Sequence, residues 1–246
     1  MGKIVILTSG KGGAGVSCAA AVFAAELAET GRRVLLMDLA AGLRTQDFLT
    51  AADELLLYDL ADAAAGRCTL QDVWYASPAY EGVWVLPAPG KKDEMPSAAQ
   101  TVDLLRRCAQ CFDHVVVDCP AGSNLLFELA GAADDVAICC TPDPMSVRAC
   151  AAVREELAEA FAGEARLIIS KFNEEEMLAV WNTNDLDGVI DGVGLRLLGV
   201  VPRDTAFARW ITARDQRVGK TAAWGALGRC CARLRGETIP LSLKRS

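Results

Sequence analysis

The chain has 246 residues, of which 52% are hydrophobic, and its formal net charge is −7. This length and apolar content are enough for one buried core, and no linker-like stretch divides the sequence, so we expect a single domain over residues 1–246. The negative charge argues against sequence-independent binding of nucleic acid, which depends on a basic surface.

The first predicted elements surround a glycine-rich segment. Residues 3–8 form an apolar run that predicts a buried strand, and the alanine-rich residues 18–29 predict a helix. Between them, residues 10–17 fit the phosphate-binding pattern G-x-x-x-x-G-K-[ST] except at the lysine, which is replaced by Val16. Such a loop binds phosphate because its glycines let backbone N–H groups converge on an anion at a helix N-terminus. Ser17 keeps the hydroxyl that would reach Mg²⁺.

Strands and helices alternate along the rest of the chain. Strands rich in Val, Ile and Leu are expected at residues 33–38, 82–87, 114–118, 134–140, 166–171 and 196–201, and helices at residues 53–65, 97–112 and 221–235. Continuous apolar strands occur where helices cover both faces of a parallel sheet. The sequence therefore predicts an α/β fold with one doubly wound, mostly parallel sheet.

Two aspartates, Asp38 and Asp118, end predicted strands. Because open α/β sheets bind ligands at the carboxyl ends of their strands, a magnesium-associated role is favoured for Asp118. The alternative is a buried aspartate that caps the next helix. Asp38 would join the outer shell of the metal or cap the following turn.

The segment TSGKGGAGVS, residues 8–17, resembles the deviant Walker A motif KGGxGK[ST] of the MinD/ParA family of P-loop ATPases. Further segments resemble that family in order and spacing. They are residues 37–44 (the D-x-D-x-G-L-R switch), 117–122 (the D-x-P-A-G switch), 141–148, and 170–173 with 201–204 (the adenine-side loops). The resemblance covers nearly the whole chain.

The resemblance implies a site for ATP or ADP with Mg²⁺. Nucleotide contacts are expected from Gly10, Lys11, Gly12, Gly13, Ala14, Gly15, Val16, Ser17, Cys18, Asn173, Pro202 and Asp204, and metal contacts from Ser17, Asp38 and Asp118. In this family the early lysine, here Lys11, reaches the partner's nucleotide across a dimer interface. A nucleotide-dependent homodimer, or a heterodimer with a paralogue, is therefore expected, with Lys11 catalytic in trans if the protein is active.

Two departures from the family pattern bear on catalysis. Val16 replaces the lysine that holds the β- and γ-phosphates, and Ala40 stands where the family carries an aspartate that positions the attacking water. Phosphoryl transfer depends on positioning and charge neutralisation, so these losses predict impaired or absent hydrolysis. Backbone donors, Ser17, Asp118 and a metal ion remain, so weak nucleotide binding is expected to persist.

Three functions from different classes remain open. The resemblance favours a nucleotide-binding spatial regulator or scaffold, acting in division-site placement or a related task with a partner of the cell-division type. The alternatives are an active ATPase that uses Lys11 in trans and a nucleotide-independent interaction protein of the TadZ-like pilus-assembly type. Binding to MinC or MinE does not carry over, because Ala149 stands where the family usually has an aspartate.

Ten cysteines raise the question of a metal site. Cys108 and Cys111 have ligand spacing, yet no second pair with suitable spacing complements them. Unpaired cysteines in a reducing compartment behave as small buried hydrophobic residues, and this is the favoured interpretation.

The last residues predict no strong membrane attachment. Residues 237–246 form a short irregular tail in which Pro240 interrupts three large apolar residues, too few for a stable interfacial helix. No apolar run approaches the roughly 18 residues that span a bilayer, and the first residues lack a signal-peptide pattern. These observations favour a cytoplasmic protein.

Overall fold

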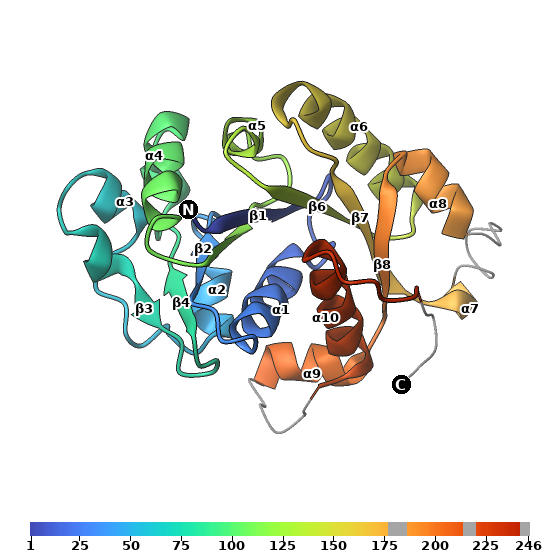
Figure 1. Ribbon diagram of the computed structural model, residues 1–246, viewed down its shortest axis with the longest axis horizontal. Coiled ribbons are helices and arrows are strands. Elements are labelled where there is room, and N and C mark those ends of the chain that lie inside the picture. Colours follow the sequence, from blue (N-terminus) through green and yellow to red (C-terminus); the bar gives the residue numbers. More distant parts are fainter. Residues whose placement is uncertain (177–185, 214–219, 242–246) are drawn as a thin grey trace.

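The computed structural model describes residues 1–176, 186–213 and 220–241. Within these ranges the strands form one sheet in the order β3-β4-β2-β5-β1-β6-β7-β8 (Figure 1). The strands are β1 (Lys3–Thr8), β2 (Val34–Asp38), β3 (Tyr75–Ala76), β4 (Val83–Leu86), β5 (His114–Asp118), β6 (Asp135–Cys140), β7 (Arg166–Phe172) and β8 (Arg196–Pro202). Neighbouring strands are parallel except for β3 and β4.

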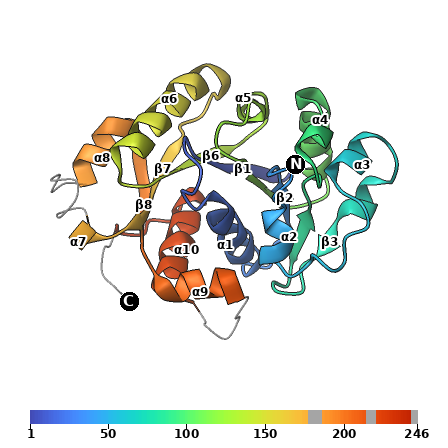
Figure 2. The same cartoon turned by 180° about the vertical axis from the view of Figure 1, so that it is seen from behind.

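Helices cover both faces of the sheet (Figures 1 and 2). One layer contains α1 (Val16–Ala28), α2 (Thr45–Leu49), α9 (Thr205–Ala213) and α10 (Ala222–Leu234). The other contains α3 (Leu60–Ala64), α4 (Ala98–Cys108), α5 (Leu125–Ala130), α6 (Pro144–Ala160) and α8 (Leu186–Val193). The short α7 (Glu174–Glu176) follows β7, and 3-10 turns span Leu70–Val73 and Lys92–Glu94. The predicted doubly wound α/β fold is therefore confirmed.

The pleat of the central strand divides the core into two parts. In β1, Ile4 and Ile6 pack into the layer of α4, α5 and α6, whereas Val5 and Leu7 pack against α1. All four side chains are buried. This arrangement explains the unbroken apolar run, because neither face of the strand meets water.

Two local expectations differ from the structure. The edge strand β3 has two residues and was not predicted, because so short a segment carries no periodic signal. The helix expected over residues 53–65 begins only at Leu60. Asp59 starts it there, since its carboxylate accepts hydrogen bonds from the N–H groups of Ala61 and Asp62 and gives the chain a strong N-cap.

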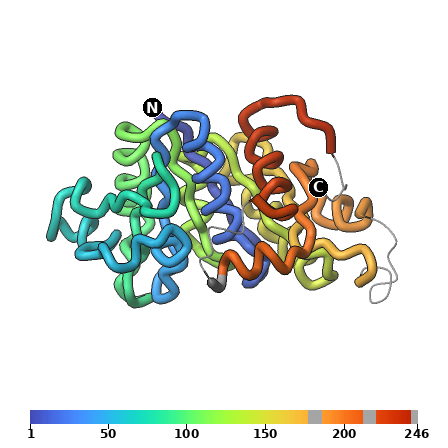
Figure 3. Tube along the Cα trace, turned by 90° about the horizontal axis from the view of Figure 1, so that it is seen from below, coloured from blue at the N-terminus to red at the C-terminus, as the bar shows by residue number. Residues whose placement is uncertain are grey.

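The last helix, α10, lies beside α1 on one face of the sheet (Figure 3). Trp224, Leu227 and Cys231 are buried in the core that the two helices share. The apolar face of this helix therefore belongs to the core. Residues 237–241 are irregular. No helix in the described ranges is both long and apolar enough to cross a bilayer.

The loop between β1 and α1 packs closely against α6 at Gly10. A Cβ atom added at Gly10 would lie 2.3 Å from the carbonyl carbon of Ala149, whereas one added at Gly12 would have no neighbour within 4 Å. The backbone of α6 therefore requires a glycine at position 10 and does not require one at position 12.

We expect Gly10→Ala to lower the free energy of unfolding by about 1–3 kcal/mol, because the backbone of α6 must shift to admit the methyl group. Gly12→Ala is the matched control and should change it by less than about 0.5 kcal/mol. Urea denaturation of the two variants measures the difference. Equal transition midpoints would contradict the packing argument.

Candidate functional site

The glycine-rich loop is open on the side away from α6. Gly13 and Gly15 have φ angles of 83° and 84°, which non-glycine residues rarely adopt. Cβ atoms added at these positions would have no neighbour within 4 Å. The loop is anchored from the sheet, because the hydroxyl of Ser170 donates a hydrogen bond of 2.7 Å to the carbonyl oxygen of Ala14. Open space therefore surrounds the loop backbone directly before the N-terminus of α1, the end of a helix at which anions bind.

Val16, the residue that replaces the motif lysine, begins α1 and is buried. Its side chain is 9% exposed and belongs to the core cluster beneath the helix, together with Ala20 and Leu7. The position therefore contributes apolar packing in place of an ammonium group. Ala40, the other departure, is also buried, and its N–H donates a hydrogen bond of 2.7 Å to Asp38.

Asp38 and Asp118 lie opposite each other at the carboxyl ends of β2 and β5. Both side chains are essentially inaccessible to solvent. Burial, followed by the charge of Asp118, raises the pKa of Asp38 to about 7, and burial also raises the pKa of Asp118. The side chain of Ser17 is close enough to lower the pKa of Asp118 against this rise. Two carboxylates and a hydroxyl therefore meet beside the loop.

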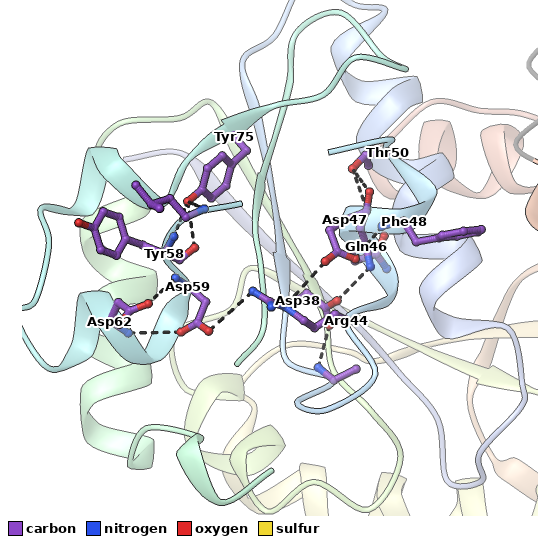
Figure 4. A network of polar contacts seen from close by, with 12 residues as sticks. Asp38, Arg44, Gln46, Asp47, Phe48, Thr50, Tyr58, Asp59, Asp62 and Tyr75 are labelled. Atoms are coloured by element: carbon purple, nitrogen blue, oxygen red, sulfur yellow. Dashed lines mark hydrogen bonds and ion pairs between the residues drawn. The ribbon is translucent and has the colours of Figure 1, made fainter. Parts of the chain in front are cut away.

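Gln46 is a site residue that the sequence did not identify. It is fully buried, and its Nε2 donates hydrogen bonds of 2.7 Å to Oδ2 of Asp118 and 2.9 Å to the carbonyl oxygen of Ser17. Its backbone N–H donates to Asp38 at 3.0 Å (Figure 4). The side-chain oxygen Oε1 is buried and has no hydrogen-bond partner among the residues that the structure describes. A single polar residue in a helix as short as α2 carries no sequence signal of such burial, so only the structure reveals it.

These donors fit a magnesium ion. Mg²⁺ prefers oxygen ligands and is usually held by few side chains together with water and phosphate. The pair Asp38 and Asp118, the hydroxyl of Ser17 and the unpartnered Oε1 of Gln46 supply such oxygens. In the described ranges no cluster of three or more His, Cys, Asp or Glu side chains is arranged to hold a metal by itself.

The segment after β2 is fixed by charged contacts (Figure 4). Arg44 lies between two carboxylates, with Nε 3.8 Å from Asp47 and a terminal nitrogen 3.7 Å from Asp59. The Tyr75 hydroxyl accepts hydrogen bonds from the N–H groups of residues 57 and 58. The conformation of the predicted switch segment is thus set by contacts with α2 and α3.

Lys11 lies on the surface of the loop and pairs within its own chain. Its Nζ is 3.3 Å from Oδ1 of Asp143, the residue that caps α6. Burial raises the pKa of Asp143, but hydrogen bonds from Thr141, Ser146 and Lys11 lower it by more than burial raises it. The pKa of Asp143 is therefore below its ordinary value. Half of the lysine side chain is exposed, so the contact is weak and Lys11 can turn outward at little cost.

A cavity of about 390 Å³ adjoins the loop on the side of β7 and β8. Its lining includes Gly15 and Cys18 from the loop and α1, and Pro202 and Asp204 from the end of β8. Asn173 is not among the lining residues, and its side-chain oxygen accepts a hydrogen bond from Glu175. The structure therefore gathers most of the predicted adenine-side residues around one cavity and leaves Asn173 outside it.

Asp204 also has a structural role. Its carboxylate accepts hydrogen bonds from the N–H groups of Ala206, Phe207 and Ala223, and so joins the start of α9 to α10. A larger cavity, of about 720 Å³, lies at the opposite edge of the sheet near Lys3 and contains none of the predicted site residues. We place the candidate site at the smaller cavity, because Ala14 and Gly15 of the glycine-rich loop line it.

Comparisons with known proteins identify the family of this chain. The family described as "CobQ/CobB/MinD/ParA nucleotide binding domain" matches residues 5–217. The septum site-determining protein MinD of Bacillus subtilis is 27% identical over 256 residues, which cover 99% of this chain and 92% of that protein. The MinD protein of Synechocystis is 30% identical over 206 residues, covering 83% of this chain and 77% of that protein.

Solved structures share the fold. A chain of the MinC:MinD cell division protein complex of Aquifex aeolicus superposes with a TM-score of 0.86 at 23% identity, covering 99% of this chain and 100% of that one. The septum site-determining protein MinD from Pyrococcus horikoshii, complexed with Mg-ADP, superposes with a TM-score of 0.81 at 20% identity. That match covers 95% of this chain and 96% of the other.

The buried carboxylate pair leads to a pH prediction. Because the pKa of Asp38 is raised from 3.8 to about 7, the folded chain holds a proton between these pH values that the unfolded chain releases. The free energy of unfolding should therefore fall as pH rises through this window. We expect Asp38→Asn to remove this contribution, so that the variant gains stability relative to the natural chain as pH rises.

Urea denaturation of both proteins at pH 5 and pH 7.5 tests the prediction. The amide introduced by Asp38→Asn has one acceptor oxygen, so the variant would lose one of the two N–H hydrogen bonds that Asp38 accepts, and a constant offset between the proteins is expected. The relevant result is the change of that offset with pH. Parallel pH profiles would contradict the raised pKa.

Proposed function

This chain belongs to the CobQ/CobB/MinD/ParA nucleotide-binding domain family, and on that premise we propose that it is a MinD-like protein that binds ATP or ADP with Mg²⁺. It acts as a spatial regulator or scaffold, in division-site placement or a related positioning task, and its hydrolysis is impaired or absent. The observation that carries the proposal is the cavity that lies between the open loop and the segment that follows β8.

The nucleotide would occupy the loop and the adjoining cavity. The open space at Gly13 and Gly15 before the N-terminus of α1 suits the phosphates, and the cavity beside Cys18, Pro202 and Asp204 suits the base and ribose. A relative of the same fold was solved with Mg-ADP, which supports this assignment. Asn173 would join the site only if its segment moved.

Magnesium would be held near Ser17, Asp38 and Asp118, where it neutralises phosphate charge. The Ser17 hydroxyl is the direct ligand in this proposal, and the two carboxylates receive the waters of the ion. Gln46 keeps Asp118 oriented toward that position through its hydrogen bond of 2.7 Å. The chain's own residues would thus position the ion. Val16 supplies no ammonium group for the phosphates, and Ala40 supplies no carboxylate to position the attacking water.

The protein is proposed to form a nucleotide-dependent homodimer, or a heterodimer with a paralogue. Three large apolar side chains, Leu43, Leu57 and Met145, are exposed on segments that follow β2 and β6. Exposed apolar side chains at a functional edge are typical of interaction surfaces. The similar MinD proteins, one of them solved in a complex with MinC, favour a partner of the cell-division type. MinC itself is not proposed as the partner, because Ala149 stands where the family usually has an aspartate.

Calorimetric titration with ATP and ADP in the presence of Mg²⁺ tests the proposal. We expect micromolar or weaker binding by the natural chain, and at least about tenfold tighter binding by Val16→Lys, equivalent to about 1.4 kcal/mol. The lysine stem can occupy the apolar site of Val16 while its ammonium reaches the phosphates. The gain should be present for ATP and ADP.

Val16→Met is the matched control, since it lengthens the side chain without adding charge. An equal gain in the methionine variant would assign the effect to packing. If Val16→Lys binds no more tightly than the natural chain, the loop is not the nucleotide site. If neither protein binds a nucleotide, the nucleotide-independent interaction protein becomes the better account.

An active ATPase that uses Lys11 in trans is the second candidate, and the exposure of Lys11 favours it. In that case we expect phosphate release per chain to rise with protein concentration and to vanish in Lys11→Ala. Lys3→Ala, which removes an exposed lysine at the opposite edge of the sheet, is the control and should retain activity. Turnover that is independent of protein concentration would exclude catalysis across a dimer.

A further inference from the structure

Lys171 is a cation that faces the candidate nucleotide cavity from the end of β7. It lines the cavity together with Gly15 and Cys18, and it comes from a different element than the loop. We propose that Lys171 supplies the positive charge that the phosphate-binding loop lost at Val16, by contacting the α-phosphate of the bound nucleotide. This inference rests on the nucleotide site proposed above.

The backbone of β7 directs Lys171 to this place. The pairing of β7 with β8 shifts between Ile169 and Phe172, so that β7 contains one more residue than β8 over this stretch. Lys171 lies within the irregularity and has a φ of 54°, in the left-handed region that lysine rarely adopts. Bulges beside binding sites commonly redirect a side chain, and strained backbone is retained where function requires it.

The charge of Lys171 acts on the first turn of α1. Burial and the charge of Asp118 raise the pKa of the Cys18 thiol to about 11, and the charge of Lys171 opposes this rise. Cys18 follows Ser17 in the first turn of α1 and lines the same cavity as Lys171. The ammonium is therefore close enough to influence groups bound at the helix N-terminus.

Within the described part of the chain, the ammonium group of Lys171 is not held in an ion pair, in contrast to the guanidinium group of Arg203 in the same cavity. Arg203 is paired with Glu176 at 2.9 Å. Among the described residues, none forms an ion pair with Lys171, which is exposed at the cavity rim. An unpaired ammonium beside open N–H groups suits a phosphate, because charge-assisted hydrogen bonds are about twice as strong as neutral ones.

The position of Lys171 determines which phosphate of the nucleotide its ammonium group would contact. A lysine at position 16 would reach the β- and γ-phosphates. Lys171 instead approaches from the cavity that accommodates the base and ribose, beside Cys18. It should therefore stabilise AMP, ADP and ATP alike, whereas a lysine restored at position 16 should favour ADP and ATP over AMP.

The test uses Lys171→Asn in the natural chain and in the Val16→Lys background. Asparagine tolerates a positive φ, so this variant removes the charge without adding backbone strain. Affinities for AMP and ADP with Mg²⁺ are measured by competition with a fluorescent ADP analogue. We expect Lys171→Asn to weaken both nucleotides at least about tenfold, with undiminished stability in urea.

Two further variants separate charge from structure. Lys171→Arg keeps the cation and should bind AMP and ADP within about threefold of the parent chain. Arg67→Gln removes a cation that is paired with Asp62 at 2.6 Å outside the cavity, and should also cost less than about threefold. Losses of equal size in Arg67→Gln and Lys171→Asn would overturn the specific role of Lys171.

The outcomes distinguish this inference from the proposed function. If Val16→Lys binds ADP and the added Lys171→Asn change leaves AMP and ADP affinities unaltered, only the role of Lys171 fails. The same conclusion follows if Lys171→Asn weakens ADP but not AMP. If neither the natural chain nor Val16→Lys binds any nucleotide, the proposed function fails, and this inference fails with it.

Discussion

The burial of Asp38 beside Asp118 is the constraint to which the rest of the candidate site responds. Two carboxylates in a poorly solvated place cannot both be ionised without compensation. No lysine or arginine of the described ranges forms an ion pair with either of them. Instead, N–H groups, the amide of Gln46 and the hydroxyl of Ser17 surround the pair. Such a pair holds a proton or accepts a cation, so its environment suits a metal-dependent site.

The same pair joins the loop to the segment after β2. Gln46 contacts Ser17 of α1 and Asp118 of β5 through its side chain, and Asp38 of β2 through its backbone. That segment continues to Arg44 and its two carboxylate partners. A change in charge at the pair therefore acts on contacts that fix the exposed segment around Leu43. The contacts give a physical route from a bound ion to a surface suited to partners.

Sequence alone predicted the parts of this protein that depend on repeating patterns. The buried strands and the loop of residues 10–17 were found because apolar runs and glycine spacing are local signals. The predicted start of the helix at residue 53 was wrong, because Asp59 caps α3 and the helix begins only at Leu60.

The missed residues depend on tertiary structure. Gln46 and Lys171 could not be recognised in the sequence, because their roles follow from the burial of one polar residue of the short helix α2 and from a register shift between strands. Neither property has a local pattern. By contrast, the carboxylates were predicted beside the loop because strand ends of a parallel sheet share one edge.

The glycines of the loop differ in what requires them, and this difference bears on whether the loop still binds a ligand. Gly10 is required by the backbone of α6, and Gly13 and Gly15 by their positive φ angles. These three would be retained by the fold of the loop even without a ligand. Gly12 has neither a close neighbour nor a positive φ, so the described protein atoms give no reason for it. A group that approaches the backbone from outside, such as a phosphate, does give one, and this argument favours a nucleotide-binding loop over an inherited but inactive one.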